Sequence, residues 1–125
     1  MKKTGIALFA MIFCVVSAAT AQLANSKWKG YVHADERIPV IWIFDKDTVQ
    51  VFSLPDSSLM EAMTYRVDPG FLFLTRVSGM SNCDNSTVGR YQYRINNDSL
   101  YLTPVDDACS QRAGAAWNEP YIRVR

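Results

Sequence analysis

The stretch that decides the fold of this 125-residue chain runs from Cys83 to Trp117 and reads CDNSTVGRYQYRINNDSLYLTPVDDACSQRAGAAW. Residues 88–95 alternate between apolar or aromatic side chains and polar ones, which predicts a β-strand with one buried face. The two faces carry Tyr91, Tyr93 and Ile95 on one side and Arg90, Gln92 and Arg94 on the other. A second strand, residues 99–103, is predicted after a short polar turn.

That turn, Asn96-Asn97-Asp98, fixes the register of the two strands. Residues 97 and 98 both tolerate positive φ, so they suit the two central positions of a tight hairpin. Ile95 then faces Leu100, and Tyr93 faces Leu102, which gathers the apolar side chains on one face. A slip of one residue would scatter them over both faces.

The end of the stretch predicts a short helix and a last strand. Asp106 is a good N-cap residue, and Asp107 suits the positive end of a helix. Residues 108–113 are expected to form one or two helical turns, which Gly114 stops. Residues 117–124 follow as the final strand.

The first residues of the chain have the pattern of a cleaved secretory signal peptide. A positive start is followed by an apolar run over residues 5–16 and an Ala-x-Ala pattern at 19–21. The apolar run is shorter than the roughly 20 residues that span a bilayer. We therefore assign residues 1–21 to a signal peptide, with an uncleaved membrane anchor as the alternative.

Residues 22–125 are expected to form one domain of nearly neutral charge. Without Lys2 and Lys3 of the signal peptide, the 13 Lys and Arg residues fall to 11, against 12 Asp and Glu. This balance, with no basic run, argues against nucleic acid or an anionic membrane surface as a partner. The signal peptide predicts a secreted or periplasmic protein with no membrane span in its mature form.

Two of the three cysteines remain after the signal peptide and are expected to pair. Cys14 leaves with the signal peptide, and Cys83 and Cys109 form an even pair in an oxidising compartment. A disulfide closing a loop of about 27 residues would stabilise the domain by about 3.5 kcal/mol in the chain-entropy model. Free thiols or half a metal site are the alternative. His33 is the single histidine and no Cys-x-x-Cys occurs, so a structural zinc site lacks ligands.

Five more short strands are predicted upstream, separated by turn residues: 28–34, 38–44, 48–53, 61–67 and 71–77. The turn between the second and third strands places Phe44 opposite Val49 and Trp42 opposite Val51. Pro69-Gly70 suits the centre of the turn between the fourth and fifth, whose register stays open.

Eight short strands in hairpin succession favour one fold class. The chain is predicted to be all-β, an eight-stranded antiparallel up-and-down barrel with one short helix before the last strand. Closure is how such a meander removes its exposed edges. An open two-sheet sandwich is the alternative.

The chain resembles small secreted bacterial lipocalin-like proteins of the calycin type. The resemblance rests on Cys83, Gly89-x-Tyr91-x-Tyr93-x-Ile95, Leu100-x-Leu102, Asp107-x-Cys109-x-x-Arg112 and Trp117. It is strong over residues 83–124 and loose over 28–77. Lipocalin families bind small apolar molecules inside the barrel, so the resemblance implies a binding protein with an unspecified ligand.

Aromatic side chains on the predicted strands are candidates to line a cavity, because they supply apolar walls with hydroxyl groups. These candidates are Trp42, Phe44, Tyr65, Tyr91 and Tyr93. The alternative is that they fill the barrel. Strands about 20 Å long, tilted near 40°, give a barrel about 16 Å high. Such a barrel is either solid or holds one small ligand in a small cavity open at one end.

Two further sites involve arginine. Arg112 follows Cys109 by three residues, so the disulfide would place it near the barrel rim. There it can receive an anionic head group or form a salt bridge with Asp106 or Asp107. At the other end, Arg123 and Arg125 of the last strand are expected to lie next to Trp28 and to seal the barrel by cation–π stacking. We interpret that contact as structural.

No catalytic constellation stands out. His33 has Asp35 and Glu36 nearby, but a strand sends residues 33 and 36 to opposite sides. No serine or cysteine has the local context of a nucleophile, and no phosphate-binding loop occurs. We therefore assign no catalytic residues, no metal ligands and no cofactor.

Two functions from different classes follow. The first is an exported lipocalin-like protein that holds a small hydrophobic or amphipathic molecule. The second is a solid-core barrel that acts through its surface as a protein-binding or inhibitory module in the cell envelope. A cavity would favour the first, and an exposed cluster from the loop residues Leu54, Leu59, Met60 and Met80 would favour the second.

Overall fold

The computed structural model describes residues 23–115 and 119–125. The predicted signal peptide and Trp117 lie outside these ranges and stay predictions. The described elements are β1 (Ser26–His33), β2 (Arg37–Phe44), β3 (Thr48–Ser53), β4 (Leu59–Asp68), β5 (Phe71–Gly79), β6 (Val88–Asn96), β7 (Ser99–Asp106), α2 (Ser110–Ala115) and β8 (Tyr121–Arg123).

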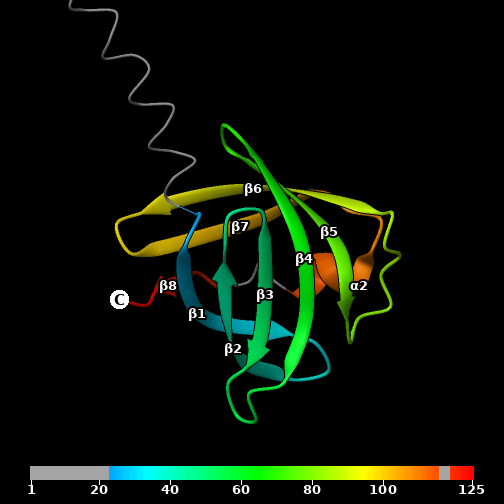
Figure 1. Ribbon diagram of the computed structural model, residues 1–125, viewed down its shortest axis with the longest axis horizontal. Coiled ribbons are helices and arrows are strands. Elements are labelled where there is room, and N and C mark those ends of the chain that lie inside the picture. Colours follow the sequence, from blue (N-terminus) through cyan, green and yellow to red (C-terminus); the bar gives the residue numbers. More distant parts are fainter. Residues whose placement is uncertain (1–22, 116–118) are drawn as a thin grey trace, which may run out of the picture.

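The strands close into an antiparallel up-and-down barrel in the order β1 to β8, as the sequence predicts, and not into an open sandwich. Figure 1 shows β6 and β7 running across the view behind the strands β2 to β4, with α2 lying on the side where β5 ends. The last strand completes the barrel by pairing with β7 on one side and β1 on the other. The sheet therefore has no free edge there.

The hairpin registers argued from the hydrophobic pattern are confirmed. Phe44 pairs with Val49, and Trp42 pairs with Val51. In the β6–β7 hairpin, Ile95 pairs with Leu100 and Tyr93 pairs with Leu102. Residue 97 at its turn has φ 56°, a conformation that asparagine tolerates better than most residues.

The β4–β5 hairpin, whose register the sequence leaves open, pairs Val67 with Leu72. Leu72 is therefore turned into the core and fully buried. Phe73 lies on the outer face, where the Arg66 guanidinium stacks 4.0 Å from its ring centre. Gly70 at the turn has φ 81°, the positive value that this position requires.

The helix differs in detail from its prediction. It begins at Ser110 instead of residue 108, and Gly114 lies inside it. Asp106 is not the cap, because β7 continues past Pro104 through a register shift and ends at Asp106. Cys109 instead occupies the position before the helix, where its carbonyl oxygen accepts the first helical hydrogen bond from the Ala113 N–H at 3.0 Å. Asp107 supports the turn into the helix, since its Oδ1 accepts a hydrogen bond from the Cys109 N–H at 2.9 Å.

One end of the barrel is sealed around Trp28. This side chain is fully buried, donates its indole N–H to Ser26 Oγ at 2.8 Å, and lies under the Arg123 guanidinium at 4.3 Å. The predicted cation–π seal is confirmed for Arg123. Arg125 instead pairs with Asp98.

Candidate functional site

The opposite end of the barrel holds a cavity of about 500 Å³. Its inner wall is apolar and comes from β1 to β4, with Val32, Ile38, Trp42, Val51 and Met63. Its rim is more polar and includes residues of the β1–β2 loop, the β5–β6 loop and α2. Of the loop residues from Leu54 to Met60, only Met60 belongs to the described lining.

An aromatic layer forms the floor between the cavity and the sealed end. The Trp42 ring stacks on Phe44 with centres 6.0 Å apart, and Phe44 meets Tyr65 edge-on at 5.1 Å. Trp42 also packs against the fully buried Tyr121 at 5.5 Å. These interlocked rings fill the closed half of the barrel, which confines the cavity to the open half.

Every methionine of the described residues lies on the cavity wall: Met60, Met63 and Met80. Met63 is almost fully buried, whereas Met80 is 71% exposed at the rim. The Met80 N–H donates to the Met60 carbonyl oxygen at 2.7 Å, which joins the start of β4 to the end of β5. Unbranched thioether side chains adapt their shape, so this part of the wall can follow ligands of different outline.

Several charged residues at or next to the rim are paired, whereas Asp35 on the lining forms no ion pair within the described residues. His33 Nε2 lies 3.3 Å from Glu119 Oε2, and Arg37 donates two hydrogen bonds to the same carboxylate. Glu61 accepts hydrogen bonds from Ser81, and Arg76 Nε lies 3.6 Å from its Oε2. These pairs tie the strand ends together around the opening.

Arg112 joins the cavity wall from α2 and is held by Asp107. Its Nε and Nη2 donate to the two carboxylate oxygens at 2.7 and 2.9 Å, and Nη2 also donates to the Thr87 carbonyl oxygen at 3.1 Å. The Arg112 side chain is 6% exposed and that of Asp107 is fully buried. Tyr91 donates its hydroxyl to Asp107 Oδ2. Of the two roles predicted for Arg112, the salt bridge with Asp107 is confirmed.

The network sets the protonation of its members. Burial alone would raise the pKa of Asp107, but hydrogen bonds from Arg112 and Tyr91 outweigh it and lower that pKa. Burial and the hydrogen bond to Asp107 both raise the pKa of Tyr91 well above its usual value. Arg112 and Asp107 are therefore both charged near neutral pH.

One donor of this network has no acceptor. Nη1 of Arg112 is buried and makes no hydrogen bond to any of the described residues. A buried donor without a partner costs about 1–3 kcal/mol, and such atoms are rare in native proteins. Arg112 belongs to the cavity wall, but this unused donor is itself buried.

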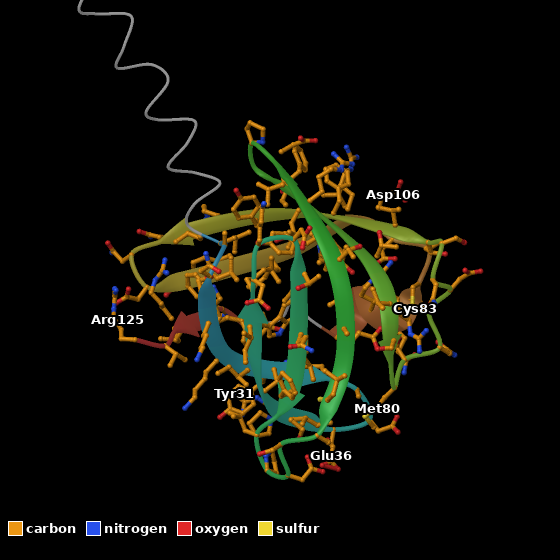
Figure 2. The ribbon with its side chains drawn as sticks, viewed as in Figure 1. Tyr31, Glu36, Met80, Cys83, Asp106 and Arg125 are labelled. Carbon is orange, nitrogen blue, oxygen red and sulfur yellow. A yellow bond between two sulfur atoms is a disulfide. The ribbon has the colours of Figure 1, made fainter. Side chains whose placement is uncertain are left out.

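A disulfide fixes α2 at this rim. Cys83 and Cys109 are bonded, with their Cα atoms 5.4 Å apart. Gln111 of the helix also accepts a hydrogen bond from the Asn82 N–H at 3.0 Å. Figure 2 shows Cys83 and Met80 on the side of the molecule where α2 lies, with Arg125 on the opposite side. The predicted disulfide is confirmed.

The structure divides the six candidate ligand-binding residues. Trp42 and Arg112 lie on the cavity wall. The other four fill the barrel or pack beside it: Phe44 and Tyr65 lie in the floor, Tyr91 binds Asp107, and Tyr93 packs against the core. The methionines and the pair Val32 and Ile38 were missed, although the alternation of β1 and β2 would have placed the latter two inside.

Comparison with known proteins does not assign this chain to a family. No family model, curated protein or solved structure matches the chain. Within residues 23–115 and 119–125, no helix is long and apolar enough to cross a membrane. The same residues hold no group of three or more His, Cys, Asp or Glu side chains suited to a metal ion. The cavity and its geometry are therefore the basis for a functional proposal.

Proposed function

We propose that this chain is an exported lipocalin-like protein that binds one small hydrophobic or amphipathic molecule in its open-ended cavity. The observation that carries the proposal is the cavity itself, about 500 Å³ in volume and lined mainly by apolar side chains. Ligand sites in proteins have volumes of about 300–1,000 Å³ and mostly apolar walls with a few polar groups. The cavity of this barrel meets both criteria.

The volume limits the ligand to a small molecule. A water molecule occupies about 30 Å³ of liquid, so 500 Å³ corresponds to a ligand of roughly 17 non-hydrogen atoms. That is the size of a medium-length alkyl chain or a two-ring aromatic compound. Larger ligands would extend past the exposed Met80 into solvent.

Export fits this role and remains part of the proposal. The disulfide between Cys83 and Cys109 is of the kind that persists outside the cytoplasm. Together with the signal-peptide pattern of residues 1–21, it supports a secreted or periplasmic location. A binding role, with no catalysis, fits the apolar wall best.

A fluorescence titration tests binding directly. N-phenyl-1-naphthylamine, a neutral apolar fluorophore, gains emission when it enters a dry cavity, and Trp42 in the wall is positioned to transfer excitation to it. We expect saturable 1:1 binding to the folded protein and none to the protein unfolded in urea. Native mass spectrometry of protein purified from its own host should also detect a bound small molecule.

A matched pair of variants locates the binding. Val51→Phe fills space in the cavity, because Val51 is 4% exposed and lies on its wall. It should weaken fluorophore binding at least tenfold. Val105→Phe makes the same change on the outer surface, where residue 105 is 44% exposed, and should leave binding unchanged. Equal affinities of both variants would contradict binding in the cavity.

The solid-core alternative finds less support. It predicts a filled interior, whereas about 500 Å³ is open inside the barrel. Of the four loop residues that would form its apolar surface, Met60 and Met80 belong to the cavity wall. Leu54 and Met80 are exposed, but Leu59 and Met60 are half-buried. Met60 and Met80 are better explained as part of the mouth of a ligand site.

A further inference from the structure

The methionines of the cavity wall differ in how far they are open to a ligand. Met63 on the inner wall is 3% exposed, whereas Met80 at the rim is 71% exposed (Figure 2). Met60 is half-buried between these extremes. The backbones of Met60 and Met80 are adjacent, because the Met80 N–H donates to the Met60 carbonyl oxygen at 2.7 Å. Two accessible thioethers therefore lie next to each other at the open end of the cavity.

The inner wall behind them is tightly packed. Trp42 is 3% exposed and Val51 is 4% exposed, so each offers a ligand only a small area. The ring of Trp42 is also used within the protein, since it stacks on Phe44 and packs against Tyr121. The more accessible apolar groups near the mouth, Met60 and Met80 among them, are therefore placed to distinguish one apolar ligand from another.

The acidic group at the mouth restricts the ligand less. Asp35 lies on the lining, is exposed, and forms no ion pair within the described residues. Water and salt screen an exposed charge of this kind, so its attraction for a cationic group is weak. Selection by the cavity should therefore act mainly on the apolar part of a ligand.

A thioether distinguishes an aromatic ring from an alkyl chain. Its polarisable sulfur makes favourable contacts about 5 Å from a ring, often at the ring edge, and each contact is worth about 2- to 10-fold in affinity. An alkyl chain gains only ordinary dispersion from the same atom. A flat ring system also has few rotatable bonds to immobilise, whereas a long chain loses freedom in every bond that becomes ordered.

We propose that the cavity selects ligands whose apolar part is an aromatic ring system, and that the thioethers of Met60 and Met80 favour it over an alkyl chain of equal size. This inference rests on the proposed binding function and specifies its ligand class. A two-ring system fits within about 500 Å³ and leaves room for a substituent at the mouth. Met60 and Met80 act as the specificity residues.

Nuclear magnetic resonance of the methionine methyl groups tests where the ring lies. The probes are 2-naphthol and decan-1-ol, which have the same number of non-hydrogen atoms and one hydroxyl group each. The protein is labelled with carbon-13 at its methionine methyl groups, and substitution to leucine assigns their resonances. We expect 2-naphthol to move the Met60 and Met80 resonances by its ring current, with a smaller change at the buried Met63. Decan-1-ol has no ring current and should move all three less.

A volume-conserving double variant tests the thioether contribution. Met60→Leu/Met80→Leu keeps the apolar wall at similar volume but removes both sulfur atoms. It should weaken binding of 2-naphthol about tenfold and leave that of decan-1-ol nearly unchanged. Both dissociation constants come from displacement of N-phenyl-1-naphthylamine, whose own affinity is measured for each protein. Interactions of the probes with water are the same for both proteins, so they cancel when the two affinity ratios are compared.

The same substitution at a buried position is the matched control. Met63→Leu removes a sulfur atom from the inner wall, where the side chain is 3% exposed, and should change the affinity ratio less than the rim pair does. Urea unfolding confirms that each variant is folded at the temperature of the titrations.

The outcomes separate the inference from the binding function. If the ratio of the two affinities is the same in the wild type and the rim variant, the inference is overturned while the binding function stands. The same holds if 2-naphthol leaves the Met60 and Met80 resonances in place, or if Met63→Leu changes the ratio more than the rim pair. If neither probe nor the fluorophore binds, the proposed function itself fails.

Discussion

At the residue scale, a single glycine determines whether the buried ion pair can form. Gly89 lies on β6 directly beneath Asp107 and Arg112, and an added Cβ would lie 2.3 Å from Asp107 Oδ2 and 3.0 Å from Arg112 Nη2. No real side chain tolerates the shorter distance, so the carboxylate would have to move. The ion pair therefore occupies the space that a Cβ at residue 89 would need.

Substitution of this glycine should be costly, and the same substitution nearby should be favourable. Gly89→Ala should lower the free energy of unfolding by about 3 kcal/mol, because it displaces a buried ion pair in a packed wall. Gly114→Ala should raise it by about 0.5–1 kcal/mol, since residue 114 lies inside α2 and a Cβ there meets nothing within 4 Å. Urea unfolding measures both, and changes of the same sign would contradict this account.

The buried carboxylate also predicts how stability depends on pH. The pKa of Asp107 is lowered in the folded protein, so its stabilising contribution is present above the unfolded pKa of about 3.9 and is lost as pH falls through the folded value. Asp107→Asn should cost about 3 kcal/mol at pH 7, and the difference from the wild type should shrink towards pH 2.5. Urea unfolding across this pH range provides the measurement.

The adjacent acid supplies the control. Asp106 is exposed at the end of β7, so Asp106→Asn should change stability by less than about 0.5 kcal/mol at any pH. A pH profile for Asp107→Asn parallel to that of the wild type would show that the carboxylate is not bound in its charged form.

At the element scale, strands were predictable and the helix bounds were not. A strand's inner and outer faces follow from a two-residue period, which is why Tyr93 opposite Leu102 could be inferred locally. The helix start depends on where β7 ends, and β7 continues past Pro104 only because β6 offers a register shift opposite it. The end of β7, and with it the start of the helix, is thus determined by pairing with β6. The capping residues near the helix cannot predict it.

The disulfide acts on this same region, joining the β5–β6 loop to the start of α2. The Cys83→Ser/Cys109→Ser double variant should lose about 3.5 kcal/mol of unfolding free energy, the chain-entropy value for its loop. Because α2 contributes Arg112 to the cavity wall, binding of N-phenyl-1-naphthylamine should weaken as well. The reduced wild-type protein should match the variant in both measurements. An unchanged unfolding midpoint would contradict a structural role for the bond.

At the scale of the whole molecule, sequence reasoning predicted closure of the barrel but not its interior. Aromatic residues on inner faces are compatible with either a filled or a hollow barrel, because side-chain volume must be compared with the enclosed space. Here the rings of Trp42, Phe44 and Tyr65 gather at one level, and the space above them stays open. Arg112 was a correct candidate for the wall. That its Nη1 has no acceptor could not be predicted, because it follows from how β6, the loop before it and α2 pack together.

The weakest part of the closed barrel should be its seam at β8. This strand is three residues long and pairs with β1 only at Trp28 and Lys29, and with β7 only at Ser99 and Leu100. Two further backbone hydrogen bonds hold this segment. The Arg123 N–H donates to the Asp98 carbonyl oxygen at 2.8 Å, and the N–H of the next residue, Val124, donates to the Lys27 carbonyl oxygen at 2.9 Å.

Native-state hydrogen exchange should therefore find the seam opening before the rest of the barrel. We expect the amides of residues 123 and 124 to exchange with a lower opening free energy than those of the long β4–β5 hairpin, which should exchange only on global unfolding. The Tyr121 ring of β8 packs directly on Gly30 of β1, which strengthens the seam. A Cβ added at Gly30 would lie 2.3 Å from this ring. Gly30→Ala should thus lower the opening free energy of β8 more than that of β4 and β5. Equal protection of all strands would mean that the barrel opens only as one cooperative unit.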